Sequence, residues 1–202
     1  MKKKSVAKNR ENLKQNFCKV DHSKSLVPEI KQKISGIAEK LVYNYKKNDS
    51  IKQIGCEKIP SKDSIIEIIE ELEYILFPGY FGNQDITDSS LEYNIGSNLF
   101  RLFDKISEQI SKSFRHRCAS EHYRMCLDCY NHGVKLAYRI IEQLPDIRNL
   151  LNEDIQAAFD GDPAAKSIDE IVFSYPGFKA IFIYRIANCM HKLDIPLIPR
   201  IM

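Results

Sequence analysis

Apolar residues recur at every third or fourth position along most of this chain, the period typical of amphipathic helices. The first such stripe holds Ile30, Ile34, Ile37 and Leu41. A second and cleaner stripe extends over residues 65–76. We find no segment that alternates like a strand over a useful length, and no internal repeat. The pattern therefore predicts an all-α fold, a bundle of about seven or eight helices.

Residues that cap or break helices set the expected boundaries. Capping boxes, in which a Ser hydroxyl and a Glu carboxylate satisfy free amides of the first turn, begin at Ser64, Ser89 and Ser167. Pro78 and Gly79 are expected to end the helix that starts at Ser64. The loop that follows should pack its two aromatic residues on the core, namely Tyr80 and Phe81.

Three more helices are expected in the middle of the chain. A long apolar stripe runs over residues 91–114, and the next helix covers residues 119–144 and is closed by Pro145. Asp146 caps the helix after it. Gly161 is placed to end that helix in a left-handed conformation.

The last expected helix, roughly residues 177–193, is apolar nearly all round and should lie between other layers. We divide the chain into a basic flexible arm (1–22), a helical N-terminal domain (23–175), and a connecting helix with the start of a linker (176–202).

Charge is unevenly distributed along the chain, with an excess of positive charge in the basic arm. Residues 1–16 contain six lysines and arginines against Glu11 alone, a local charge of +5 in a chain whose net charge is +3. Such an arm could touch nucleic acid or an acidic surface. The favoured interpretation is a solvated terminus, so we expect no nucleic-acid partner.

Composition narrows the class of protein. With 202 residues, 44% of them hydrophobic, the chain can bury a sizeable core. No apolar run approaches the roughly 18 to 20 residues of a membrane span, and no apolar core of a secretory signal follows the basic N-terminus. The six cysteines are scattered through a helical chain, unlike a small disulfide scaffold. We expect reduced thiols, a cytoplasmic location and no membrane partner.

Three short motifs in residues 154–202 carry a family resemblance: Asp162-Pro163-Ala164, the turn Tyr175-Pro176-Gly177-Phe178, and Tyr184-Arg185-Ile186-Ala187. In sequence and spacing they resemble the segment that leads into the catalytic domain of serine O-acetyltransferases. The stretch 144–148 is similar to a bacterial subgroup of that family with a long N-terminus. The resemblance is weaker before residue 119, and Asn188 stands where family members commonly have His.

The resemblance implies a reaction and its machinery. Enzymes of this family transfer acetyl from acetyl-CoA to the hydroxyl of L-serine in cysteine synthesis, and a His acts as general base on that hydroxyl. That His and its carboxylate partner lie in a left-handed parallel β-helix of hexapeptide repeats, which is not in this chain. We therefore expect no catalytic residue and no bound cofactor here, and no activity from these residues alone. The family also implies a homo-oligomer that assembles through its helical domains.

One substrate-binding residue of the family matches this chain. The Asp of the Asp-Pro-Ala motif reaches the serine site from the helical domain, and it corresponds to Asp162. A carboxylate held between a helix end and Pro163 suits a serine ammonium or hydroxyl group. The alternative is that Asp162 only caps the next turn, as Asp before Pro often does. For Arg185 we expect a structural ion pair, and for Tyr184 and Tyr175 a packing role.

A run of cysteines and histidines supports a rival hypothesis of a helical interaction or structural-metal module. Residues 116–132 include His116, Cys118, His122, Cys126, Cys129 and His132. On a continuous helix, His122, Cys126 and Cys129 would share one face and could meet one ion, with a fourth ligand such as Cys118. Cys126 and Cys129 could also be a redox pair. The favoured interpretation is that the thiols pack in the bundle, with the histidines at its surface.

Overall fold

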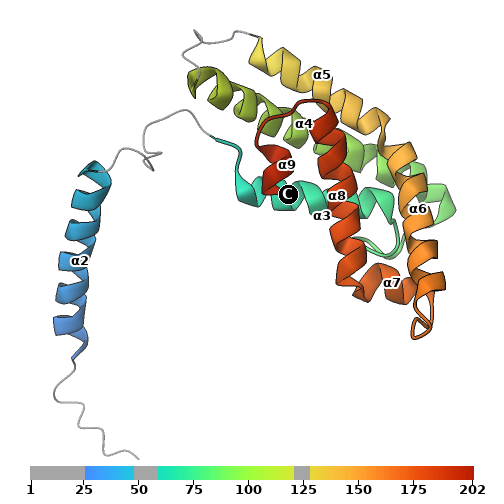
Figure 1. The fold of residues 1–202 in the computed structure, drawn as a ribbon, viewed down its shortest axis with the longest axis horizontal. Helices are drawn as coiled ribbons and strands as arrows, with labels where there is room; N and C mark the ends of the chain where they lie inside the picture. The colour runs from blue at the N-terminus through green and yellow to red at the C-terminus, as the bar shows by residue number, and fades with distance from the viewer. Residues whose placement is uncertain (1–25, 48–58, 121–127) are drawn as a thin grey trace, which may run out of the picture. The chain divides into compact units, whose positions relative to one another are not determined.

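The computed structural model describes residues 26–47, 59–120 and 128–202, and within these ranges it is built of helices (Figure 1). The chain falls into two compact units, Met1–Gly55 and Cys56–Met202. Helix α2 lies in the first, and helices α3 to α9 form the second. The described residues contain no strand beyond an isolated bridge between Pro78 and Phe81. The predicted all-α fold is confirmed, while the three-part domain division stays a prediction.

Helix α2 (Val27–Lys47) confirms the first predicted stripe as a helix. Within this helix Lys33 Nζ donates to Glu29 Oε1 at 2.7 Å, an i,i+4 pair on the exposed surface. None of its residues is buried, so its apolar stripe is exposed along the whole helix.

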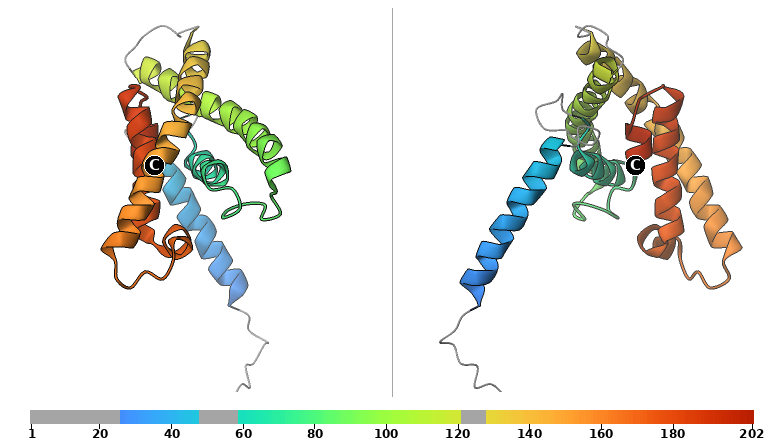
Figure 2. Two further views of the ribbon diagram at one scale, coloured as in Figure 1. Left: turned by 90° about the vertical axis from the view of Figure 1, so that its right-hand side faces the viewer. Right: turned by 60° about the vertical axis from the view of Figure 1, so that its left-hand side comes forward.

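Helix α3 (Lys62–Leu76) lies in the middle of the second unit, with α4 on one side and α8 on the other (Figure 2). The predicted start at Ser64 is wrong by one turn, because Ser61 is the N-cap. The backbone of Ser61 is extended, and its hydroxyl accepts from the Ser64 N–H at 3.3 Å. The Ser61 N–H donates in turn to the buried Gln109 side chain at 2.9 Å, which fixes the start of α3 against α4.

The turn after α3 follows the prediction. Phe77 ends the helix, and Gly79 takes a φ of 86°, a left-handed value that a residue with a side chain rarely adopts. Tyr80 and Phe81 then pack against the core. The ring of Phe77 meets those of Phe178 and Phe182 edge to face, which joins the end of α3 to α8.

Helices α4 (Asp88–Ser120) and α5 (Cys129–Glu142) lie side by side as an antiparallel hairpin (Figure 1). The predicted cap at Ser89 is wrong, because Asp88 already begins the helix. The predicted helix over 119–144 is wrong as well: its first two residues belong to α4, and α5 begins at Cys129. The two helices approach closely where Gly133 faces Ser111.

Helices α6 (Leu144–Gly161), α7 (Ile168–Ser174), α8 (Pro176–Lys192) and α9 (Ile198–Ile201) complete the second unit. Pro145 lies in the first turn of α6, where its missing N–H costs nothing, so it opens this helix and does not close the previous one. Gly161 is not left-handed; the extended Asp162 is the C-cap. The predicted cap of α7 is confirmed, since Ser167 Oγ accepts from the Glu170 N–H at 3.1 Å.

Helix α8 does not lie between layers as predicted. Phe182, Ile186 and Met190 are buried, but Tyr184 is 63% exposed and Ile181 40% exposed. The side of α8 that carries Tyr184 and Ile181 therefore forms part of the surface of the described chain.

Candidate functional site

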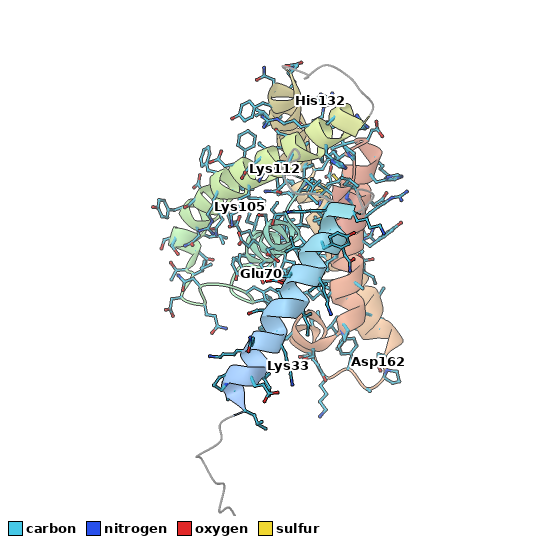
Figure 3. The ribbon with its side chains drawn as sticks, turned by 90° about the vertical axis from the view of Figure 1, so that its left-hand side faces the viewer. Lys33, Glu70, Lys105, Lys112, His132 and Asp162 are labelled. Atoms are coloured by element: carbon cyan, nitrogen blue, oxygen red, sulfur yellow. The ribbon has the colours of Figure 1, made fainter. Side chains whose placement is uncertain are left out.

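The candidate site is the turn that joins α6 to α7, where Asp162 lies near the lower end of the unit in Figure 3. Both oxygens of its carboxylate are hydrogen-bonded. Oδ1 accepts from the Ala164 N–H at 2.9 Å, which closes a local turn over Pro163. Oδ2 accepts from the Tyr175 hydroxyl at 2.7 Å. The predicted capping of the next turn by Asp162 is thus present, together with a second contact.

These contacts favour the charged form of the acid. The hydrogen bond from Tyr175, and then that from the Ala164 N–H, lower the pKa of Asp162 below its ordinary value of 3.8. The same bond raises the pKa of Tyr175 above 10.0, because ionised Tyr175 would lose it and face a carboxylate. Asp162 is therefore a carboxylate at neutral pH. Each of its oxygens can accept a further bond, since a carboxylate has about four lone-pair sites.

Tyr175 is placed for this contact by two helices. It is the C-cap of α7 and the N-cap of α8, with an extended backbone between them. Its ring packs against the core. The sequence predicted a packing role for Tyr175, and the structure adds its bond to Asp162. Nothing in the local sequence signals that bond, because the two residues meet only through the path of α7.

A cavity of about 270 Å³ lies beside Tyr175. Its walls are mostly aromatic and come from α3, the turn after it, α7 and α8. Two charged residues also line it: Lys179 Nζ lies 3.0 Å from Glu73 Oε1, and the Glu73 side chain is buried. The sequence pattern did not single out this pair, because Glu73 lies within an otherwise ordinary amphipathic helix.

Arg185 makes the structural ion pair expected of it. Its Nε and Nη2 both donate to Asp154 on α6, with Nη2 to Oδ1 at 2.6 Å, so the pair is bidentate. The prediction for Tyr184 is wrong, since an exposed side chain cannot be a packing element of this chain. Arg185 thus ties α8 to α6 on the stretch that leads to Asp162.

The Cys/His run is divided between α4 and α5. Cys118 and Cys129 meet across the hairpin, with their Sγ atoms 3.8 Å apart, while His122 and Cys126 lie outside the described residues. The ring of His132 stacks edge-on against Phe114 at 4.6 Å. Among the residues that the structure describes, no three acidic, Cys or His side chains are placed to hold a metal ion. The metal hypothesis assumed one continuous helix through this run, and that assumption is wrong because Cys118 and Cys129 lie on separate helices.

Two further predictions concern the ends and the environment of the chain. The basic arm, residues 1–22, lies outside the described ranges. No helix in the described part of the chain is both long and apolar enough to cross a membrane.

Comparison with known proteins confirms the family resemblance in sequence. The family profile "Serine acetyltransferase, N-terminal" matches residues 104–182. A plasmid-encoded serine acetyltransferase of Synechococcus elongatus is 34% identical over 145 residues, which cover 71% of this chain and 46% of the relative. A serine acetyltransferase of Bacillus pumilus is 43% identical over 53 residues, 26% of this chain and 24% of the relative. The chain thus spans less than half of the length of either relative.

Solved structures agree with the sequence comparison. Serine acetyltransferase 1 of Entamoeba histolytica, in complex with L-cysteine, matches with a TM-score of 0.52 and 29% identity over 71% of this chain and 44% of that one. The native form of the same enzyme gives the same TM-score with 28% identity, covering 82% of this chain and 55% of that one. Sequence and fold therefore point to the same region of the same family.

Proposed function

We propose that this chain, which carries the helical N-terminal region of the serine acetyltransferase family, supplies Asp162 to the serine-binding site of a serine O-acetyltransferase. In that reaction acetyl passes from acetyl-CoA to the L-serine hydroxyl, and both molecules are substrates of the whole enzyme. The general base and the acetyl-CoA contacts are assigned to the β-helix domain of the family. The cytoplasm is the proposed location, in keeping with the thiols of Cys118 and Cys189.

The geometry of Asp162 supports a role in binding. Its carboxylate is ionised, and the bonds from Ala164 and Tyr175 hold the plane of the group. A group held in this way does not lose rotamer freedom when a ligand arrives, so the entropy cost of binding is small. The ammonium of serine could donate to the remaining lone pairs at the same time. This is the observation on which the proposal rests.

The test is a kinetic comparison in an acetyltransferase chain that contains these residues together with the β-helix domain. Asp162→Ala should raise the KM for serine by about tenfold or more, because a charge-assisted bond to the ammonium contributes on the order of 1.5–3 kcal/mol. The KM for acetyl-CoA should change by less than about twofold. Equal effects on both constants would show that Asp162 is only structural.

A matched control is available two residues earlier. Asp160 is exposed at the end of α6 and accepts from Gln156 Nε2 at 2.8 Å, so it has the same charge without the bond to Tyr175. Asp160→Ala should leave both KM values unchanged. A rise in the serine KM as large as that of Asp162→Ala would mean that general negative charge, not Asp162, attracts serine.

We also propose that α2 joins copies of the chain in a homo-oligomer. Its apolar stripe has the heptad spacing of a coiled-coil seam over two heptads, with a and d positions filled by Val27, Ile30, Ile34, Ile37 and Leu41, before the polar Asn44 at the next d position. In a parallel pair, Lys33 would face Ala38 of the other helix and Lys40 would face Tyr45, so no lysines are opposed. A second copy of the same seam would cover residues that are exposed in α2 by itself.

A further inference from the structure

Two thiols from different helices lie within reach of each other at the tip of the α4–α5 hairpin. Cys118 is in the last turn of α4, and Cys129 is the first residue of α5. Their Sγ atoms are 3.8 Å apart. A disulfide needs a separation of about 2.05 Å, so the gap to be closed is on the order of 1.8 Å. Rotation of a Cys side chain about χ1 moves its Sγ by a distance of this order.

The close packing of the hairpin holds this pair together. A β-carbon at Gly133 would lie 2.3 Å from Ser111 Oγ and 2.9 Å from the Ser107 carbonyl oxygen, so the α5 backbone touches α4 directly. Cys129 is one turn before Gly133 on α5, and Cys118 is two turns after Ser111 on α4. The tight contact therefore sets the rotation of both helices at the position of the thiols.

We propose that Cys118 and Cys129 are a redox site, which a two-electron oxidant of the peroxide class converts to a disulfide across the α4–α5 hairpin. This site is independent of the proposed acetyltransferase role, since it lies on other helices than Asp162 and its partners. It also differs from the pair that sequence spacing suggested, Cys126 and Cys129.

The reaction balances with hydrogen peroxide as the oxidant. The Cys118 thiolate, which is half-buried and the more accessible of the two, attacks one peroxide oxygen. The O–O bond breaks, hydroxide leaves as water with the thiol proton, and Cys118 becomes a sulfenic acid. Cys129 then attacks the Cys118 sulfur, the S–O bond breaks, and a second water leaves. Two thiols are oxidised and one peroxide is reduced to two waters.

The charges at the hairpin tip support this chemistry. Cys129 lies at the N-terminus of α5, where the helix dipole favours an anionic sulfur. The turn of α4 that holds Cys118 also contains Arg115 and Arg117, and Arg117 Nη1 lies 3.5 Å from Asp194 Oδ2. Cys189 on α8 is a contrasting thiol, because its Sγ donates to Gln143 Oε1 at 3.5 Å and does not meet Cys118 or Cys129. A thiol in that setting is expected to be inert.

Peptide mapping of the whole 202-residue chain tests the proposal. The protein is treated with hydrogen peroxide, remaining thiols are alkylated, and the product is cut with trypsin and with a protease that cleaves before Asp. The cut before Asp128 separates Cys126 from Cys129, so each possible disulfide gives a distinct linked peptide. We expect peptide 118–124 linked to peptide 128–135, with a mass lower by two hydrogen atoms than the sum of the two. Cys189 should be alkylated.

Cysteine variants distinguish the Cys118–Cys129 disulfide from disulfides that involve Cys126. Cys126→Ser should leave the link intact, and Cys118→Ser should abolish it, with no unfolding expected at this half-buried position. The oxidised chain should also unfold at a thermal midpoint higher by about 5 °C, because the disulfide closes a loop and so lowers the conformational entropy of the unfolded chain. Cys118→Ser should lose this increase. The proposal is overturned if Cys118 and Cys129 are both alkylated after peroxide treatment, or if either forms a disulfide with Cys126 instead. It is also overturned if zinc alone protects the thiols of Cys118, Cys126 and Cys129 from alkylation and prevents the Cys118–Cys129 disulfide.

Discussion

The carboxylate of Asp162 accepts a hydrogen bond from the hydroxyl of Tyr175 at 2.7 Å, and this contact joins the turn after α6 to the start of α8. Tyr175 follows Asp162 by 13 positions, and the whole of α7 lies between the two partners. The contact fixes the direction of the acid that we assign to serine binding. Any change that moves α8 relative to α6 is therefore transmitted to that acid.

The first prediction concerns Tyr175→Phe, which removes the phenol hydroxyl and should raise the pKa of Asp162 toward its ordinary value of 3.8. Because folding lowers this pKa, the contact stabilises the fold above pH 3.8 and is lost as the pH falls through the lowered value. Wild type and variant should therefore converge in stability in acid. Tyr175 has its pKa raised above 10.0, so the contact is also lost when alkaline pH passes through that raised value.

A carbon-13 NMR titration of the Asp162 carboxyl group measures this pKa directly. Tyr138→Phe is the matched control, because it removes an exposed phenol on α5 whose partner is Glu142. An unchanged Asp162 titration in Tyr175→Phe would show that the hydroxyl does not bind the carboxylate in solution.

The second prediction compares two glycines within helices. Gly133→Ala should destabilise the fold by about 1–3 kcal/mol, because its β-carbon would meet Ser111 and the Ser107 carbonyl group at sub-van-der-Waals distances. Gly96→Ala on α4 has nothing within 4 Å and should stabilise it by about 0.5–1 kcal/mol. Urea unfolding followed by circular dichroism gives both values. Two stabilising substitutions would mean that α4 and α5 are farther apart than described.

The third prediction concerns Arg185→Met, which leaves the Asp154 carboxylate without its bidentate partner. The two side chains are 28% and 17% exposed, so the expected loss of unfolding free energy is about 2 kcal/mol. Lys112→Met is the control: it breaks an i,i+4 pair with Glu108, whose side chain is 62% exposed, and should cost about 0.5 kcal/mol or less.

The double variant Arg185→Met/Asp154→Asn measures the interaction between the two side chains apart from the other contributions of Arg185 to stability. Its cost should be smaller than the sum of the two single costs, because the unpaired charge is gone. Strict additivity would show that Arg185 and Asp154 do not interact.

The fourth prediction concerns the seam of α2. Ile34→Lys places a charge in the middle of the apolar stripe and should reduce the assembled mass measured by light scattering. Ser35→Lys adds the same charge beside the stripe and should leave that mass unchanged. A wild-type chain that has the mass of a single copy at micromolar concentration would remove the basis for the seam.

Much of the fold could be predicted from the sequence, because helical periodicity is a local property. The stripes of α2, α3 and α4 follow directly from the spacing of their apolar residues. Helix starts were harder to place. The sequence pattern predicted a cap at Ser64, whereas the cap is Ser61, whose N–H donates to Gln109 48 residues away. A local pattern contains no information about such a contact.

The candidate site was partly predictable for the same reason. Asp162 belongs to a contiguous motif, so the resemblance found it. Its partner Tyr175 belongs to a second motif, and only the path of α7 brings the two together. The thiol pair was missed because the run 116–132 was treated as one helix, whereas Cys118 and Cys129 face each other from opposite sides of a hairpin.

The contact between Gly133 and Ser111 also sets the rotational phase of the hairpin tip. One residue added to α4 between Ser111 and Phe114 would turn everything after it by about 100°. Cys118 would then rotate away from Cys129, and Phe114 away from His132. The spacing of seven residues from Ser111 to Cys118 therefore determines whether Cys118 faces Cys129. An insertion within this spacing should abolish the disulfide, although the composition of both helices would be almost unchanged.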